Sequence, residues 1–139
     1  MYSVTKVIHF CYGHRLRNYS GKCRHLHGHN GKVEIELTVE RLDARGMVRD
    51  FEEVKQTIQR WIDTTLDHTM LLRRDDPIVK HLKAARERHH LMGTNPTAEA
   101  IAKLIFDHAK AAGFPVTSVR LWETAHSFAT YKPARTRGS

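Results

Sequence analysis

The hydrophobic period of the chain changes after residue 49, and this change restricts the folds that the chain can adopt. Over residues 33–39 apolar and polar side chains alternate, which is the pattern of a half-buried strand: Val33-Glu34-Ile35-Glu36-Leu37-Thr38-Val39. A less regular alternation over residues 4–12 predicts another strand. After Asp50 the apolar residues recur at helical spacing, at Phe51, Val54, Ile58, Trp61, Ile62 and Leu66. Asp50 and Glu53 resemble a capping box at the start of this predicted helix.

Strands and helices are grouped along the chain rather than alternating. A second helix is predicted to start at Asn95-Pro96-Thr97, with Asn95 or Thr97 as its N-cap, and to end at Gly113. Two further strands are predicted over residues 116–122 and 128–132. The order of two strands, two helices and two strands favours an α+β fold with an antiparallel sheet.

Residues 1–132 are predicted to form one domain, followed by a basic and flexible tail over residues 133–139. The segment between Asp67 and Asn95 is long for a connection, so we expect a short helix after Pro77. The pair His89-His90 in this segment is expected to lie in solvent.

Composition narrows the class of protein. The 139 residues are 40% hydrophobic, which suffices for a core without disulfide staples. No apolar run is long enough to cross a bilayer and the N-terminus lacks a signal-peptide pattern, so we expect a cytoplasmic protein without a membrane partner. Cys11 and Cys23 are then expected to be free thiols, although the sequence alone leaves a disulfide between them open.

The net charge of +8 permits nucleic acid, an anionic membrane surface or a small phosphorylated ligand as partner. Part of this charge lies in the tail, and part surrounds a histidine-rich stretch, at Arg15, Arg17, Lys22, Arg24 and Lys32. From the sequence alone, these five residues are equally well explained as a solvated basic loop or as a phosphate-binding group.

The histidine-rich stretch is Cys23-Arg24-His25-Leu26-His27-Gly28-His29. If the strand over residues 33–39 extends back to His27, then His27 and His29 share its apolar face and can offer two nitrogens to one metal ion. The dipeptide Asn30-Gly31 opposes this, because it often forms a tight turn. A catalytic zinc site needs a third protein ligand, for which His9, His14 and His25 are candidates.

Three other positions are typical of proton transfer or ligand binding, and each also has a structural explanation. Cys23 is either a buried thiol or a reactive one. Asp67-His68 is either a charge pair at the end of a helix or a carboxylate that orients an acid–base imidazole. Glu123 follows an apolar strand, where a buried carboxylate needs donors, and a ligand with paired N–H groups would supply them.

Six blocks of the sequence carry a resemblance to a known family: residues 10–16, 23–29, 46–51, 67–68, 95–99 and 123–124. In the order and spacing of these blocks the chain resembles the 6-pyruvoyltetrahydropterin synthase and 6-carboxytetrahydropterin synthase superfamily over nearly its whole length. The resemblance implies that His14, His27 and His29 bind Zn²⁺ and that His25 stays off the metal.

The resemblance also implies roles for the remaining site residues. Cys23 matches the catalytic thiol, and Asp67 with His68 matches a second proton-transfer unit. Glu123 matches the carboxylate that holds the pterin ring, and Thr97 lies in a block that lines the same pocket. The chain departs from the family pattern at residues 11–13, Cys-Tyr-Gly, where small residues are common, so we expect a different pocket wall.

The implied fold is the T-fold, or tunnelling fold, in which a four-stranded antiparallel sheet carries two helices on one face. Trimers of such domains close into barrels and pair into a homohexamer, with active sites between subunits.

The implied reaction converts 7,8-dihydroneopterin triphosphate to 6-carboxy-5,6,7,8-tetrahydropterin, acetaldehyde and triphosphate, a step toward queuosine and related deazapurines. The nearest alternative is a 6-pyruvoyltetrahydropterin synthase, which releases triphosphate without cleaving the carbon chain. A non-catalytic zinc or nucleic-acid binding module is a more distant one. The partner implied by the resemblance is therefore a small pterin triphosphate, rather than nucleic acid.

Overall fold

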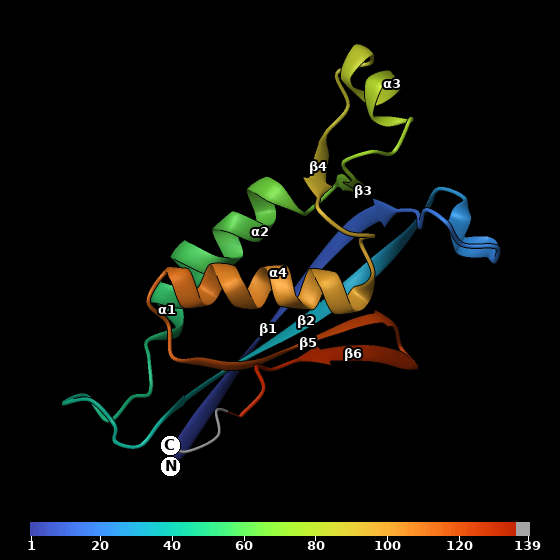
Figure 1. Cartoon of the computed structure of the whole chain (residues 1–139). Coiled ribbons are helices and arrows are strands. Elements are labelled where there is room, and N and C mark those ends of the chain that lie inside the picture. The colour runs from blue at the N-terminus through green and yellow to red at the C-terminus, as the bar shows by residue number, and fades with distance from the viewer. Residues whose placement is uncertain (136–139) are drawn as a thin grey trace.

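Six strands form one mixed sheet in the order β4-β3-β1-β2-β5-β6 (Figure 1). The computed structural model describes residues 1–135; the end of the predicted tail, residues 136–139, lies outside the described residues. The strands are β1 (Tyr2–His14), β2 (His27–Val39), β3 (Thr69–Arg73), β4 (His89–Met92), β5 (Val116–Thr124) and β6 (Ser127–Tyr131). The β1–β2, β2–β5 and β5–β6 pairs are antiparallel, whereas β3 runs parallel to both β1 and β4.

The predicted α+β class is confirmed, but the predicted four-stranded antiparallel sheet is wrong. The four expected strands are present, and β3 and β4 extend the sheet beyond β1 with parallel pairing. Both added strands are short, and β3 buries the neighbouring residues Leu71 and Leu72, so it has no period-two pattern. His89 and His90 lie half-buried in β4, which corrects the prediction that they lie in solvent.

Two long helical segments supply the other layer of the fold. The first consists of α1 (Phe51–Val54), a π-helical stretch η2 (Lys55–Gln59) and α2 (Arg60–Thr65), and the second is α4 (Ala98–Ala111). The side chain of Asp50 accepts a hydrogen bond from the amide of Glu52, as a cap should, while Glu53 pairs with Arg49 instead of completing the capping box.

The caps of α4 and two short helices complete the fold. Thr97 caps α4 by accepting a hydrogen bond from the amide of Ala100 over 3.1 Å, and Gly113 follows the helix at a φ of +89°. The short helix expected after Pro77 is present as α3 (Val79–Ala84), and η1 (Lys22–Arg24) lies in the loop between β1 and β2. Within residues 1–135, no helix has both the length and the apolar character to span a membrane.

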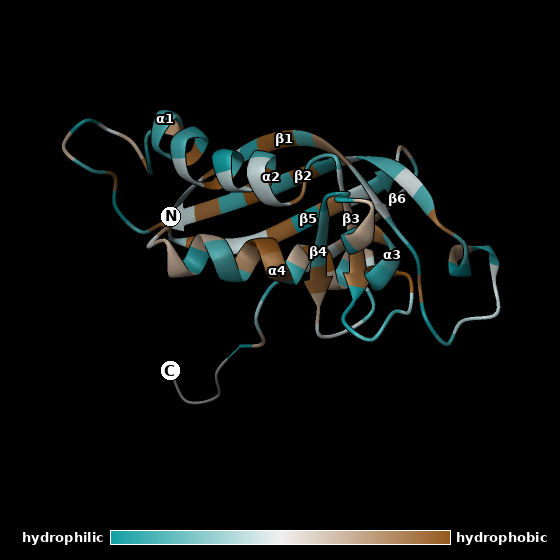
Figure 2. Ribbon diagram, turned by 90° about the horizontal axis from the view of Figure 1, so that it is seen from above, coloured by the Kyte–Doolittle hydropathy of each residue, from teal (hydrophilic) through white to brown (hydrophobic). Residues whose placement is uncertain are grey.

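The core lies between one face of the sheet and these two helical segments. In Figure 2 bands of hydrophobic and hydrophilic residues alternate along the long strands, so each of these strands presents one apolar face. Even positions of β1 and odd positions of β2 are buried with Val54, Ile58 and Ile62 of the first segment and Ile101 and Ile105 of the second. The helices thus cover the sheet face to which His14, His27 and His29 belong.

Candidate metal centre and active site

The pairing of β1 with β2 brings three histidines together. His14 lies opposite His27, and Tyr12 lies opposite His29, so all four side chains share the face of the sheet that carries the core. The strand from His27 runs through Asn30-Gly31 without a turn, as the extension back from residue 33 requires. The potential ligand atoms of the three histidines all lie within 4.8 Å of one another.

The hydrogen bonds of two of these rings leave their second nitrogens free for a metal ion. Nδ1 of His14 lies 2.6 Å from the carbonyl oxygen of Pro96, and Nδ1 of His27 lies 2.7 Å from that of His25. Because a carbonyl only accepts, each Nδ1 carries the proton and donates, so each Nε2 presents a lone pair. Such bonds to backbone carbonyls are the usual support of metal-binding histidines.

The distance between two ring nitrogens fits a shared ion. Nε2 of His14 lies 3.1 Å from Nε2 of His29, close to the separation of about 3.3 Å that two ligands have at a tetrahedral zinc. Burial lowers the pKa of His14, which is 2% exposed, and so favours the neutral ring that binds metals. The donor set of three imidazole nitrogens therefore suits zinc.

Glu123 extends from β5 toward two of these histidines, His14 and His29. Its carboxylate oxygens lie 3.9 Å from Nε2 of His14 and 4.0 Å from Nε2 of His29. The hydroxyl of Tyr12 donates to Oε1 of Glu123 over 3.2 Å, so Tyr12 is the protein donor that this carboxylate requires. Burial and the neighbouring carboxylate raise the pKa of Tyr12, which keeps its proton on the hydroxyl.

Asp67 and His68 form a hydrogen-bonded pair at the corner between α2 and β3. Nδ1 of His68 lies 2.8 Å from Oδ2 of Asp67, which can only accept, so the ring donates. Burial by itself would raise the pKa of Asp67, but the hydrogen bonds from the Cys11 amide and from His68 outweigh it and lower this pKa. The carboxylate therefore stays charged and fixes the tautomer of the imidazole.

Cys11 is a site residue that sequence reasoning missed. Its Sγ lies 3.9 Å from Nε2 of His68, and Cys11, Asp67 and His68 form a second cluster of potential metal ligands. The sequence indicated Cys11 as one of two free thiols and as part of a departure from the family pattern at residues 11–13, without a place in the site. Asp67 and His68 lie 56 and 57 positions after Cys11 in the sequence. Their contact with Cys11 depends on the pairing of β1 with β3, which no local pattern in the sequence predicts.

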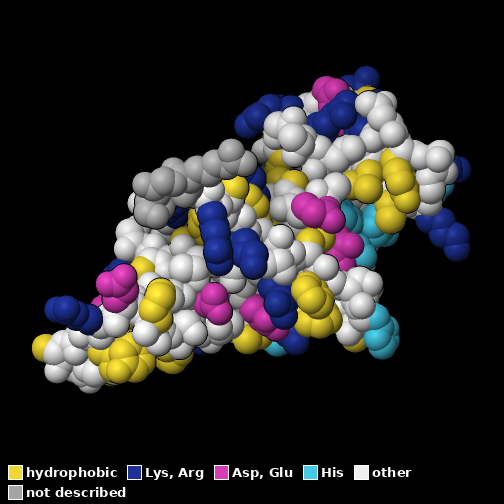
Figure 3. All heavy atoms as spheres, turned by 60° about the horizontal axis from the view of Figure 1, so that its bottom comes forward, with side chains coloured by type: hydrophobic (Ala, Val, Ile, Leu, Met, Phe, Trp, Pro, Cys, Tyr) yellow, Lys and Arg dark blue, Asp and Glu magenta, His cyan; other side chains and the backbone are white. Residues whose placement is uncertain are grey.

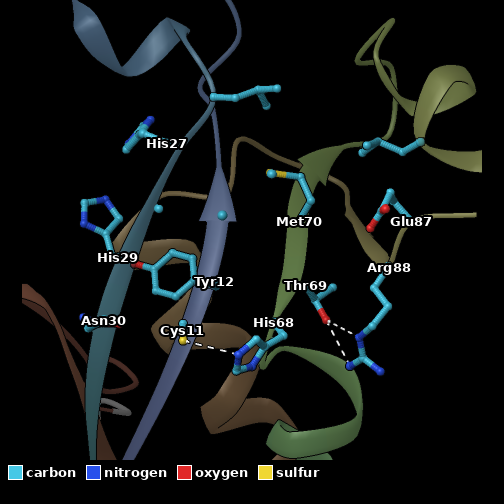
Figure 4. Close-up of a pocket in the computed structure, with 14 residues that line it drawn as sticks. Cys11, Tyr12, His27, His29, Asn30, His68, Thr69, Met70, Glu87 and Arg88 are labelled. Carbon is cyan, nitrogen blue, oxygen red and sulfur yellow. Dashed lines mark hydrogen bonds between the residues drawn. The ribbon is translucent and has the colours of Figure 1, made fainter. Parts of the chain in front are cut away.

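The two clusters lie on opposite faces of the sheet within one chain. Cys11 is at an odd position of β1, so its side chain points away from the face shared by Tyr12 and His14. The His68 ring contacts Cys11 and therefore lies on that second side. A cleft of about 660 Å³ opens at this end of the sheet and is lined from both clusters (Figure 4), by Cys11, Tyr12, His27, His29, His68 and Arg88 among others.

Two predicted site residues lie apart from both clusters in this chain. Cys23 is half-buried in η1, where its carbonyl accepts a hydrogen bond from Leu16, and it does not line the cleft. Thr97 follows Pro96, the partner of His14, and its hydroxyl caps α4. His25 is exposed and contributes its backbone carbonyl, rather than its ring, to the histidine group.

Basic and acidic side chains are mixed on the face of the molecule that Figure 3 shows. In Figure 3 basic and acidic side chains interleave across the middle of the face, while histidines gather toward one end. Lys32 and Arg120 both approach Glu34, at 3.8 and 3.9 Å, and each also lies over an aromatic ring. Part of the excess positive charge is therefore neutralised around Glu34.

Fold and site together define a class: an α+β protein with three converging histidines at the end of its sheet and a separate carboxylate–imidazole pair. Residues 3–134 match the 6-pyruvoyl tetrahydropterin synthase family, and the chain belongs to this family.

Individual relatives agree with this membership. The 6-carboxy-5,6,7,8-tetrahydropterin synthase of Rickettsia typhi is 37% identical over 139 aligned positions, which cover 92% of this chain and 98% of that protein. The structure of 6-pyruvoyl tetrahydropterin synthase from Caenorhabditis elegans has a TM-score of 0.73 and 27% identity, covering 96% of each chain. An uncharacterized Wolinella succinogenes protein gives a TM-score of 0.79 and 28% identity, covering 96% of this chain and 98% of that one.

Proposed function

We propose that this chain is a zinc-dependent 6-carboxytetrahydropterin synthase acting on 7,8-dihydroneopterin triphosphate. Its products would be 6-carboxy-5,6,7,8-tetrahydropterin, acetaldehyde and triphosphate, in a cytoplasmic route toward queuosine or a related deazapurine. The observation that carries the proposal is the convergence of three histidine nitrogens beside the Glu123 carboxylate. Curated relatives that are 30% to 37% identical over more than nine-tenths of the chain carry this enzyme name, which supports the choice of product.

In this proposal His14, His27 and His29 hold the zinc and leave a position open for the substrate. When bound, zinc supplies a Lewis acid that polarises a substrate oxygen and acidifies the neighbouring C–H bond. The carbonyls of Pro96 and His25 keep two of the rings in the tautomer that binds the metal.

Glu123 would hold the pterin ring, as the resemblance implies. A charged carboxylate accepts paired N–H groups well, and Tyr12 keeps the proton of its own hydroxyl while donating to one carboxylate oxygen. Because Glu123 also lies about as close to His14 as to His29, a pterin held there has its side chain near the metal. Thr97 would line the same pocket from the start of α4.

Proton transfer is assigned to Cys23 and to His68, with Asp67 holding the His68 ring. Within one chain the His68 ring lies on the sheet face opposite to the three histidine rings, although His27, His29 and His68 border the same cleft, and this supports an active site completed by a second subunit. We infer that the domains assemble as the T-fold does, through trimers that pair into a homohexamer. In that assembly His68 of one subunit would serve the metal site of its neighbour.

The experiment that tests the proposal is product analysis with 7,8-dihydroneopterin triphosphate. Protein stripped of metal by a chelator should be inactive, and zinc should restore formation of the 6-carboxy product together with acetaldehyde. Triphosphate release with a 6-pyruvoyl product and without acetaldehyde would favour the alternative synthase. Full zinc occupancy with no turnover of the pterin would contradict both.

A further inference from the structure

Cys11 contacts the Asp67-His68 pair through its side chain and through its backbone. Its Sγ lies 3.9 Å from Nε2 of His68 (Figure 4). Its amide donates to Oδ1 of Asp67 over 2.9 Å, and its carbonyl accepts from the amide of His68 over 2.6 Å. One residue of β1 therefore holds both members of the pair.

The His68 side chain depends on such contacts because it is largely open to solvent. It is 75% exposed, and its backbone has a φ of +54°, in the left-handed region that non-glycine residues seldom adopt. An exposed imidazole samples several rotamers unless neighbours restrict it. Asp67 restricts the ring at Nδ1, and the Cys11 thiol lies at the opposite nitrogen.

The protonation states of the three groups are compatible. The Asp67 carboxylate accepts at Nδ1, so the neutral ring offers a lone pair at Nε2, and the S–H of Cys11 is the group that can donate to it. A thiol is a weak donor, so a substrate can displace it from Nε2 more easily than a hydroxyl or an ammonium group. The separation of 3.9 Å is at the long end for a hydrogen bond to sulfur.

We propose that Cys11 is a positioning residue for His68, holding the ring with Nε2 turned toward β1 until substrate takes the place of the thiol. This inference rests on the proposed function, in which His68 carries the proton. In this role Cys11 exchanges no proton with the substrate, and the residue that does so is His68. The unusual Cys at this position of the chain thereby has a function distinct from that of Cys23.

The test compares Cys11→Ala with Cys11→Ser in the zinc-loaded protein. Without substrate, the ¹⁵N resonance of His68 Nε2 should shift in Cys11→Ala and lie near its wild-type position in Cys11→Ser, because serine restores a donor. With substrate, Cys11→Ala should lower kcat about tenfold and leave KM nearly unchanged, since a misplaced ring slows chemistry rather than binding. Cys11→Ser should recover most of this loss.

His9→Ala is the matched control, because His9 is exposed on the same face of β1 two residues earlier. It should change neither the resonance nor kcat. An unmoved His68 resonance in Cys11→Ala, or equal damage from alanine and serine, would overturn the positioning role. A shifted resonance in a protein that turns over no pterin would support the positioning while contradicting the proposed function.

Discussion

His27 and His25 differ by two positions in sequence, yet only one of them directs its ring at the candidate metal centre. His27 belongs to the converging group, whereas His25 is exposed and contributes a carbonyl to the support of His27. We therefore expect His27→Ala to lose zinc and His25→Ala to retain one zinc ion per chain. Metal analysis of the purified variants checks this, and equal loss of zinc from both would contradict the assignment.

Tyr12 is the donor that lets a partly buried carboxylate persist beside the histidines. Removing its hydroxyl in Tyr12→Phe leaves Glu123 without this hydrogen bond, and in the proposed role of Glu123 this should weaken the binding of the pterin. A lost hydrogen bond to a charged group predicts a rise in the KM for pterin of about tenfold, with a smaller change in kcat. Tyr19→Phe, at an exposed tyrosine, is the control, and steady-state kinetics that do not separate the two variants would count against the role.

At the scale of elements, the loop after β1 is joined to the start of α3 by a buried ion pair. Arg15 binds both carboxylate oxygens of Asp76, and the Asp76 side chain is fully buried and also accepts from the amide of Ile78. Arg15→Met leaves this charge unpaired, so the free energy of unfolding should fall by about 3–5 kcal/mol at neutral pH.

The pH dependence of this loss follows from the lowered pKa of Asp76, which the Arg15 guanidinium causes. In the wild type the pair contributes fully above the unfolded-state pKa of about 3.9, and the contribution disappears as pH falls through the lower folded-state value. The difference between wild type and Arg15→Met should therefore shrink in acid. Urea unfolding along a pH series measures it, and a difference that grows in acid would contradict this account.

The elements that the sequence predicted are those with a strong local pattern. The strict alternation of residues 33–39 predicted the correct face for His27 and His29. Residues an even number of positions apart on one strand share a face, and both histidines are an even number of positions from Val33. Of the two caps that the sequence offered for α4, Asn95 and Thr97, the structure uses Thr97, and the predicted end at Gly113 is confirmed by its positive φ. β3 and β4 were not predicted because short parallel strands carry no alternation of apolar and polar residues. The contact between Cys11 and His68 depends on the pairing of β1 with β3, so it was not predicted either.

In the whole molecule, the Asp67-His68 pair lies on the face of the sheet opposite to the side chains of His14, His27 and His29. If active sites form between subunits, the His29→Ala and His68→Ala variants should each be inactive alone. In a mixed oligomer some sites combine an intact His29 from one chain with an intact His68 from the other, and these sites should be active. Co-expression of the two variants should restore part of the activity. Mixing His29→Ala with His14→Ala is the control and should restore none, since every metal site then lacks one ligand.

In the proposed function, the site formed by His14, His27 and His29 supports the conversion to a 6-carboxy pterin. Its most direct test is to incubate zinc-loaded protein with 7,8-dihydroneopterin triphosphate and to quantify the pterin and acetaldehyde together. The account predicts 6-carboxy-5,6,7,8-tetrahydropterin and acetaldehyde in equal amounts, and neither with metal-free protein. Turnover that is unchanged without metal, or a tetrahydropterin formed without acetaldehyde, would contradict it.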